Sequence, residues 1–447
     1  MQSTADVAIL GAGPAAIAAA CALRRLGHSV VLVGRSRTAA VEGMSERTLT
    51  LLRQNGLEAA ARTVRGPVER TGTWAGEAVA GGAEYIVDRA ELDAALLTDA
   101  HCAAVSIRAE RALGYQSRGA LWTVRTESGE LHCQTLIDAR GRRAQRPVRR
   151  GPELIAICQR FRLQDANCSF TRLEATAHGW CWLAVDRGMG WLQVMTSLKA
   201  PSLRLGLRQH LAAFLAQTPQ MAALLCGALP LGEPVARAAT ATLSAELRRC
   251  GAQRLGDAAT ALDPLSGQGV YEALRGAHIA TAAAHTYLRT RQWEPIGQFL
   301  SERMSELWER RNATAALHYQ RQAQRTPTEF WSVAAAQYPA LDPAHARASE
   351  ATSLAWRPVL NGMCIEQRRV LVTPRFPRGV WQLEDVDLPE LIELLNTTGG
   401  DIACASRHLS RPPQMVVRAV QWLRAQGLRV APDSSPPAAG NGIGAPI

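Results

Sequence analysis

The N-terminal segment constrains the fold most, because it contains one complete strand–turn–helix–strand unit. Val7–Leu10 is a short run of β-forming apolar residues, and the glycine-rich stretch Gly11–Ala16 (GAGPAA) follows it. An alanine-rich segment then has helical character until Gly27, and Val30–Val33 is a second β-type run. Strands joined by a helix lie parallel in one sheet. The sequence therefore predicts a βαβ unit and an α/β domain with a Rossmann-type sheet.

The glycine-rich turn has the spacing of a phosphate-binding turn. Gly11 permits the tight bend, Gly13 lets a pyrophosphate approach the backbone, and the small Ala16 lets the helix pack closely on the strand. The amides at the helix N-terminus then face the phosphates. These three positions predict a nucleotide-binding site.

The acidic residue that usually follows the second strand and binds an adenosine ribose is replaced by Gly34 and Arg35. Two hypotheses follow from this departure. Either Arg35 and Arg37 bind the 2′-phosphate of NADP, or the nucleotide is a flavin whose ribose is held by other groups.

A second motif, LGDAATALDPLSGQGVYEAL at Leu255–Leu274, favours the flavin. The ribityl chain of FAD extends past the pyrophosphate and needs an acceptor, which Asp257 supplies. The isoalloxazine ring needs backbone amides where negative charge gathers on reduction, and a loop with Pro264, Gly267 and Gly269 before a helix provides them. A capped helix without a ligand is the structural alternative. We therefore expect FAD as the cofactor.

Composition restricts the class of protein. The chain has 447 residues, 47% apolar residues and a formal net charge of +11, and Lys199 is its sole lysine. This length predicts two or three globular domains. The arginine-rich run Arg140–Arg150 is expected to be a solvated loop, although an acidic partner or a phosphate would also fit it.

The ten cysteines include no CxxC pair and no cluster with His at metal-ligand spacing. We expect reduced, mostly buried thiols and no metal. The apolar N-terminus lacks a basic region before it and is interrupted by GAGP, so neither a secretion signal nor a membrane span is expected. These features favour a cytoplasmic protein.

The pattern of elements predicts a split organisation. Residues 1–155 and 245–330 form the FAD-binding domain, and residues 156–244 form a substrate domain with an inserted antiparallel β-sheet. Residues 331–373 are expected to be a connection, residues 374–431 a small winged-helix-like helical module closed by a short strand, and residues 432–447 a disordered tail.

Four segments resemble the successive FAD motifs of the flavoprotein monooxygenase and flavin-dependent halogenase superfamily: GAGPAA, the VDR segment with Leu92, IDARGR, and LGDAATALDPLSGQG. The resemblance covers roughly residues 5–285. It implies FAD contacts at the following residues: Gly11, Gly13, Ala16, Arg89, Asp257 and Gly269. Arg47 is a further implied contact.

Three further segments, VEGMSERTLTLLRQNGL, TGTWAGEA and HGWCWLAV with GWLQV, resemble a narrower group. They are similar to the flavoprotein monooxygenases that hydroxylate a tryptophan in a partner polypeptide during tryptophylquinone cofactor biogenesis, as in quinohemoprotein amine dehydrogenase maturation. This resemblance implies a C4a-hydroperoxyflavin acting on an indole. It also implies a small polypeptide partner and NAD(P)H, bound transiently or replaced by a separate reductase, as the source of electrons. A hydroxylase of free small aromatic molecules is the alternative.

A tryptophan halogenase is a weaker alternative. GWCWLAV resembles the halogenase Trp-x-Trp signature, but Ala-Val stands where Ile-Pro should follow. Halogenases resemble one another in using a lysine from the first third of the chain, whereas Lys199 lies well outside that region.

Several residues are candidates for the substrate pocket. Trp180, Trp182 and Trp191 alternate or pair across one expected hairpin, so they can face one side of the sheet. They either line an aromatic pocket over the flavin or pack the sheet onto the FAD domain. The same two interpretations hold for Trp74 and for its neighbour Glu77.

Glu272 lies just inside the helix that follows Gly269, close to the expected position of the ring. It either accepts the proton that the hydroxylated indole carbon loses or is an ordinary carboxylate at a helix start.

The C-terminal module does not have the charge of a DNA-binding domain. Residues 374–430 contain seven arginines and six acids, whereas DNA-binding modules present a basic face. A peptide-docking module or a structural cap is expected instead, and the alternative of a flavoprotein that binds nucleic acid is disfavoured. We expect a monomer without nucleic-acid or membrane partners.

Overall fold

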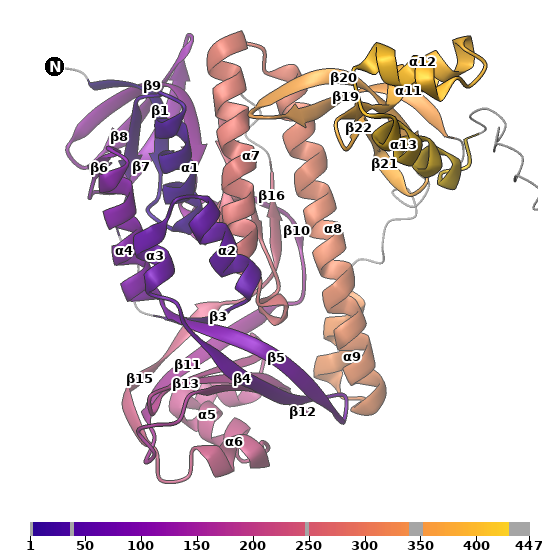
Figure 1. Ribbon diagram of the computed structural model, residues 1–447. Coiled ribbons are helices and arrows are strands. Elements are labelled where there is room, and N and C mark those ends of the chain that lie inside the picture. Colours follow the sequence, from indigo (N-terminus) through magenta and orange to yellow (C-terminus); the bar gives the residue numbers. More distant parts are fainter. Residues whose placement is uncertain (1–2, 36–39, 246–249, 339–351, 429–447) are drawn as a thin grey trace, which may run out of the picture. The chain divides into compact units, whose positions relative to one another are not determined.

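The computed structural model describes residues 3–35, 40–245, 250–338 and 352–428 (Figure 1). The chain forms two compact units. The first comprises Met1–Leu341 with Leu360–Ile365, and the second comprises Asp342–Val359 with Glu366–Ile447.

The first sheet of the first unit has the strand order β6-β2-β1-β9-β8-β7, and β17 pairs with β9. Its parallel part consists of β1 (Ser3–Leu10), β2 (Val30–Val33), β6 (Ser106–Arg108), β9 (Gly129–Asp138) and β17 (Ala252–Arg254). The antiparallel extension is formed by β7 (Ala112–Arg118) and β8 (Leu121–Thr126). This arrangement confirms the predicted βαβ unit and the Rossmann-type sheet.

Successive side chains of a strand point to opposite faces of the sheet, and both faces of this sheet are apolar. Helices cover one of them. Val7 and Ile9 of β1 are fully buried in a core with helices α1, α2, α4 and α7, whereas Ala8 and Leu10 belong to the core on the other face. The helices on that side are α1 (Pro14–Arg25), α2 (Glu46–Gln54), α3 (Glu58–Arg62), α4 (Arg89–Cys102) and α7 (Gly269–Thr290).

The second sheet has eight strands in the order β15-β11-β14-β13-β12-β4-β5-β3. Five of them come from the middle of the chain: β11 (Leu154–Arg162), β12 (Phe170–Thr176), β13 (Gly179–Asp186), β14 (Met189–Ser197) and β15 (Leu229–Ala238). One face packs on α5 (Leu207–Leu215) and α6 (Pro219–Leu224), which follow the short helix η2 (Pro201–Leu205). The other face packs on the C-terminal helices of the unit, α8 (Glu294–Arg325) and α9 (Glu329–Gln337).

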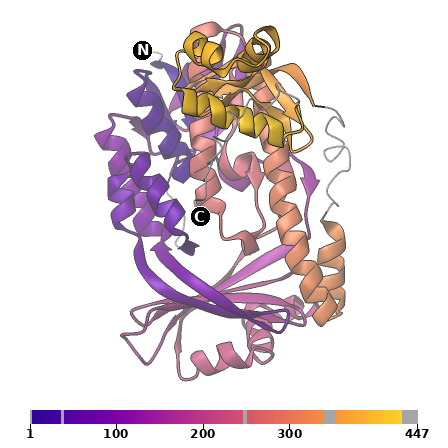
Figure 2. The same ribbon diagram turned by 45° about the vertical axis from the view of Figure 1, so that its right-hand side comes forward.

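The remaining three strands of this sheet come from the first third of the chain. They are β3 (Val41–Met44), β4 (Arg65–Trp74) and β5 (Glu77–Asp88), and β4 pairs in parallel with β12. Figure 2 shows the long β4–β5 hairpin curving along one side of the sheet. The second sheet is therefore not confined to the range 156–244, because residues within 1–155 supply three of its strands.

Short elements link the two sheets. β10 (Pro147–Arg150), β16 (Thr242–Ser244) and β18 (Thr260–Ala261) form a small sheet, and the 3-10 turns η1 (Gly141–Ala144), η3 (Gly256–Ala258) and η4 (Pro264–Ser266) lie in the connecting segments. The arginine-rich run includes η1 and β10, so it is not only a loop. Arg143, Arg146, Arg149 and Arg150 are exposed as expected, whereas Arg140 and Arg142 are partly buried. Arg140 binds Asp138 at 2.8 and 2.9 Å, and Arg142 donates to the carbonyl of Thr240.

The second unit contains the sheet β19-β20-β21 and the pair β22-β23, followed by three helices. The strands are β19 (Ser353–Asn361), β20 (Cys364–Thr373), β21 (Phe376–Val380), β22 (Gln382–Leu383) and β23 (Val386–Asp387), and the helices are α11 (Leu388–Thr397), α12 (Ile402–Leu409) and α13 (Pro413–Ala425). The three expected helices are present. The range 331–373, expected as a connection, instead contains α9, β19 and β20. The expected closing strand lies partly, and the tail 432–447 entirely, outside the described residues.

All ten cysteines are free, but only Cys21, Cys133, Cys158 and Cys181 are buried, which corrects the expectation of mostly buried thiols. In the described ranges, no helix has the length and apolar character that crossing a membrane requires. The same ranges contain no group of three or more His, Cys, Asp or Glu side chains arranged to hold a metal ion.

Candidate active site

The glycine-rich turn lies where three backbone segments meet at the ends of β1, β2 and β9. Gly11 has φ +117°, and a Cβ atom placed on it would lie 2.3 Å from the carbonyl oxygen of Ala139. A Cβ atom on Gly34, at the end of β2, would lie 2.7 Å from the carbonyl carbon of Gly11. Neither glycine can be replaced without moving backbone, so this crossing forms a bare main-chain surface.

Helix α1 starts from this crossing with its N-terminal amides free of side-chain partners. Its N-cap residue, Gly13, offers no capping side chain, and its first turn contains no acidic residue. The partial positive charge of the helix end is therefore left for an external anion. Ala16 is fully buried in the same core as Ala277 of α7, which explains the requirement for a small residue there.

The second glycine motif lies against the first turn of α1, although it is far away in the sequence. Gly256 has φ +61°, and a Cβ atom on it would lie 3.2 Å from the Cβ of Ala15. The side chain of Asp257 is 41% exposed, and its carboxylate lies 3.8 Å from Nε of Arg142. Its carbonyl accepts a hydrogen bond from Gln145 at 2.7 Å. The structure thus brings the two predicted nucleotide motifs together.

The loop between this motif and α7 is a tight turn with open space around its glycines. Pro264 starts η4, and Gly267 ends it in the left-handed conformation with φ +58°. A Cβ atom on Gly267 or on Gly269 would meet no atom within 4 Å. The turn and the N-terminus of α7 leave room for a flat ligand beside backbone amides.

These features fit FAD, because each part of the cofactor finds a suitable group. The free N-terminus of α1 and the bare crossing at Gly11 fit the pyrophosphate, and the carboxylate of Asp257 fits a ribityl hydroxyl. The turn before α7 fits the ring, since amides and a helix N-terminus favour an anionic reduced flavin.

The predicted arginines differ in their surroundings. Arg35 follows β2 at the crossing, but its guanidinium binds Glu127 at 2.7 Å. Arg89 is buried between Glu42 and Asp93, whose carboxylates raise its pKa against the opposing effect of burial. Arg47 is exposed at the start of α2 and forms no ion pair with any described residue, and Arg37 lies outside the described residues.

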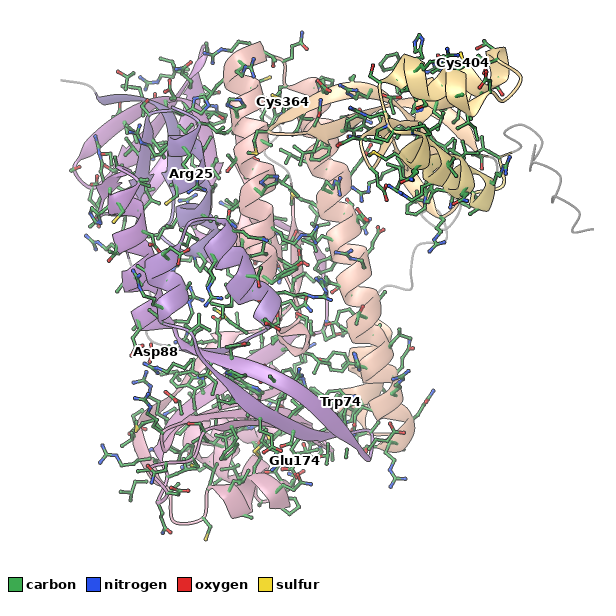
Figure 3. All side chains as sticks on the ribbon, viewed as in Figure 1. Arg25, Trp74, Asp88, Glu174, Cys364 and Cys404 are labelled. Atoms are coloured by element: carbon green, nitrogen blue, oxygen red, sulfur yellow. The ribbon has the colours of Figure 1, made fainter. Side chains whose placement is uncertain are left out.

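Aromatic side chains gather between the second sheet and helices α8 and α9. Trp74 at the tip of the β4–β5 hairpin (Figure 3) lies 5.4 Å from Trp331 and 6.4 Å from Trp180 and Tyr319, measured between ring centroids. Its indole nitrogen donates to the carbonyl of His318 at 3.0 Å. We call this group, with Tyr338 added, the aromatic cluster. It is buried, so packing accounts for much of it.

Trp182 and Trp191 extend the same face of the sheet, as their alternation predicted. Arg160 lies over the ring of Trp191, 5.4 Å from its centroid. A carboxylate that sequence reasoning missed, that of Glu84 on β5, reaches the same place. A Cβ atom on Gly43 would lie 2.4 Å from Oε1 of Glu84 and 3.1 Å from the indole of Trp182. The other oxygen of Glu84, Oε2, is buried and has no hydrogen-bond partner among the described residues.

The two predicted acids have different surroundings, and Glu272 lines a small cavity together with Asp257 and Gly269. Glu272 is buried and binds Arg311 of α8, whose Nε lies 3.1 Å from its Oε1, and it also faces Arg275. It therefore links α7 to α8. Glu77 is exposed at the turn of the β4–β5 hairpin.

Four further residues were missed: Arg142, Asp263, Tyr319 and Tyr338. Asp263 is fully buried at the start of η4, and Tyr319 and Tyr338 donate to its carboxylate. Burial raises the pKa of Asp263, and the hydrogen bonds partly oppose this rise. The position of Asp263, directly after an apolar run and before a proline, was the only indication in the sequence that its carboxylate is buried. Tyr319 carries no signal, because buried tyrosines are common in helices, and Tyr338 lies just after α9 and belongs to no recognisable motif.

A cavity of about 700 Å³ lies beside the aromatic cluster, because Leu154, Phe330 and Ala334 line it and also pack in the core of that cluster. Its walls come from the start of β11, the end of β14, helix α5 and helix α9. Lys199 lies at its rim with the side chain 79% exposed and 3.0 Å from Glu153.

Comparisons with known proteins agree with this geometry. A family model described as FAD binding domain matches residues 4–170. A solved structure of QhpG, a peptidyl tryptophan dihydroxylase essential for tryptophylquinone cofactor biogenesis, is 31% identical with a TM-score of 0.81, and the match covers 95% of this chain and 100% of that one.

Two other solved structures share the fold. CmlS, a flavin-dependent halogenase, has 18% identity and a TM-score of 0.69, with 96% of each chain covered. Aklavinone-11 hydroxylase, solved with FAD and aklavinone, has 18% identity and a TM-score of 0.59, with 72% of this chain and 70% of that one covered. The search of curated proteins gave no significant match.

The FAD-binding match lies on the glycine-rich crossing, and the similarity to QhpG extends over both sheets and the C-terminal helices. The chain therefore belongs to the family of FAD-dependent flavoprotein monooxygenases that includes QhpG.

Proposed function

We propose that this flavoprotein hydroxylates a tryptophan side chain within a partner polypeptide, as a step in tryptophylquinone cofactor biogenesis. The observation that carries the proposal is the 31% identity to a peptidyl tryptophan dihydroxylase over the whole length of that protein. The halogenase and the small-molecule hydroxylase share only the fold at 18% identity.

Bound FAD, once reduced, supplies the activation of O₂ that hydroxylation of an indole requires. The residues of the chain hold and shield the reactants. The N-termini of α1 and α7 offer amides to the phosphates and to the ring. Half-buried Trp182 offers an apolar surface to the indole, and the buried Trp180 and Trp191 pack beside it on the same face and exclude water.

Among the three acids that could accept the proton from the substituted indole, the geometry favours Glu84 over Glu272 and Glu77. A proton acceptor needs an oxygen that is not already engaged. Oε2 of Glu84 is buried without a hydrogen-bond partner among the described residues, and the carboxylate and the indole of Trp182 both approach Gly43. The carboxylate of Glu272 binds Arg311, and Glu77 is exposed at a turn. Glu84→Gln should abolish hydroxylation with the flavin still bound, and Glu272→Gln should act mainly through stability.

Halogenation is disfavoured by the position of the single lysine. Lys199 lies in the middle of the chain, with its side chain 79% exposed and 3.0 Å from Glu153. Halogenases resemble one another in using a lysine from the first third of the chain, and no lysine is present there.

The C-terminal module is proposed to bind a remote part of the polypeptide, because a second attachment raises the local concentration of the target side chain. NAD(P)H or a separate reductase would reduce the flavin. The cytoplasmic location and the monomeric state stay predictions, and light scattering on the purified protein tests the latter.

The decisive experiment supplies the FAD-loaded enzyme with a reductant, O₂ and the small polypeptide that co-purifies from the native host. Mass spectrometry should find one or two added oxygen atoms on one tryptophan. A polypeptide with that tryptophan replaced by phenylalanine is the matched control and should gain none. If the polypeptide is unchanged while free indoles or phenols are oxygenated, the enzyme is a hydroxylase of small aromatic molecules.

A further inference from the structure

A buried carboxylate lies at the base of the turn that we assign to the flavin ring. Asp263 is 3% exposed and directly precedes η4. Its Oδ1 accepts a hydrogen bond from the amide of Leu265 at 2.8 Å, inside the turn. The rest of the turn is closed by local backbone bonds, Ser266 to Asp263 at 3.1 Å and Gly267 to Pro264 at 3.0 Å. These local bonds do not attach the turn to the rest of the fold.

Two tyrosine hydroxyls provide that attachment. Tyr319 donates to Oδ2 of Asp263 at 3.2 Å, and Tyr338 donates to the same oxygen. The two rings stack with centroids 5.6 Å apart. The hydroxyl of Tyr319 also accepts from the indole nitrogen of Trp180 at 3.3 Å, so one chain of hydrogen bonds runs from the second sheet to the turn.

Both tyrosines come from outside the nucleotide-binding motifs. Tyr319 lies on α8, and Tyr338 is the residue that follows α9. Their rings are anchored in the aromatic cluster, where Tyr319 lies 5.6 Å from Trp331. The matched FAD-binding region ends at residue 170, well before either of them.

We propose that Asp263 is the positioning residue of the flavin turn, and that Tyr319 and Tyr338 hold its carboxylate so that the α8–α9 segment completes the FAD site. The proposal rests on FAD binding at this turn and not on the identity of the substrate. Without the two hydroxyls, the carboxylate keeps only the Leu265 amide in a site that water does not reach, and a buried charge with one donor is unfavourable.

If the two hydroxyls are removed, the turn loses its attachment and must become ordered when FAD binds. Ordering a loop on binding weakens affinity, whereas a loop already held in place binds without that cost. The raised pKa of Asp263 agrees with this view, because burial favours the neutral acid and the tyrosine hydrogen bonds oppose that effect.

The test compares FAD affinity and the visible absorbance of the bound flavin in four variants: Tyr319→Phe, Tyr338→Phe, the double variant and Asp263→Asn. Tyr287→Phe is the matched control, because it removes the hydroxyl of another buried tyrosine, which lies in the last turn of α7, at the opposite end of that helix from the flavin turn. Each single tyrosine variant should raise the dissociation constant for FAD about tenfold, and the double variant more. All of them should shift the flavin absorbance.

Asp263→Asn keeps an oxygen for the Leu265 amide and should weaken FAD binding less than the double tyrosine variant does. The control should keep the affinity and the spectrum of the wild-type protein. If the double variant does not fold, the single variants and Asp263→Asn give the answer.

The proposal is overturned if the tyrosine variants bind FAD within twofold of the wild type with an unchanged spectrum, whatever their thermal stability. These readouts need no substrate. A wild-type enzyme that hydroxylates no tryptophan would refute the proposed function and leave this inference intact.

Discussion

Replacing Trp74 separates packing from a role in the substrate pocket. Trp74 is 7% exposed and lies against four other aromatic rings, that of His318 included, and a backbone carbonyl. A buried tryptophan removes about 150–250 Å² from water, and at about 25 cal/mol per Å² this burial is worth about 4–6 kcal/mol. Trp74→Ala keeps the Cβ atom, so we expect the free energy of unfolding to fall by about 3–5 kcal/mol.

Trp74→Phe should cost about 1–2 kcal/mol, because it keeps a ring and loses the hydrogen bond to His318. Urea unfolding followed by circular dichroism measures both variants, with Trp356→Ala as the matched control. Trp356 is 65% exposed, and its removal should change the free energy of unfolding by less than about 0.5 kcal/mol. A Trp74→Ala protein with wild-type stability and no hydroxylation would refute the packing argument and assign Trp74 to the pocket.

Three other perturbations test the remaining parts of the site. Gly256→Ala places a side chain at φ +61° against α1 and should weaken FAD binding in a fluorescence titration, whereas Gly362→Ala, at φ +56° with open space around it, should leave FAD binding unchanged. Glu272→Gln should lower the free energy of unfolding by about 2 kcal/mol by leaving Arg311 without its carboxylate, and unchanged stability with lost turnover would restore its catalytic role. Burial raises the pKa of Asp263 in the folded state above its ordinary value of 3.8, so its contribution to stability is lost as the pH rises from that value through the raised one. Over this rise, the melting temperature of Asp263→Asn should fall less than that of the wild type.

The nucleotide motifs could be predicted because their chemistry is local. Gly11 and Gly256 each have a positive φ and a close neighbour, which require glycine, and the short motifs around them indicate this requirement. Alternation on one strand likewise places Trp180 and Trp182 on one face. Such features depend on a few neighbours in sequence.

Contacts that depend on chain topology could not be predicted in this way. Arg142 lies within an arginine-rich run that reads as a solvated loop, yet the chain folds back so that it reaches Thr240 and faces Asp257. Strand β19 contains Pro358, which argues against a strand in a sequence reading although edge strands tolerate it. Tyr319 shows only the spacing of a buried helix face, and its link to Asp263 exists only in the folded chain.

The pairing of β4 with β12 also governs how the protein can be assembled during synthesis. The β4–β5 hairpin leaves the ribosome early, but its parallel neighbour β12 is made about a hundred residues later. The first sheet is complete only after β17 has been made, and the second only after β15. The turn at Asp263 gains its hydrogen bonds from Tyr319 and Tyr338 only after both tyrosines have been made. The nascent N-terminal half therefore displays an unpaired strand edge that invites association with other chains. Production of this protein in fragments, or at high rates of synthesis without chaperones, favours aggregation over folding.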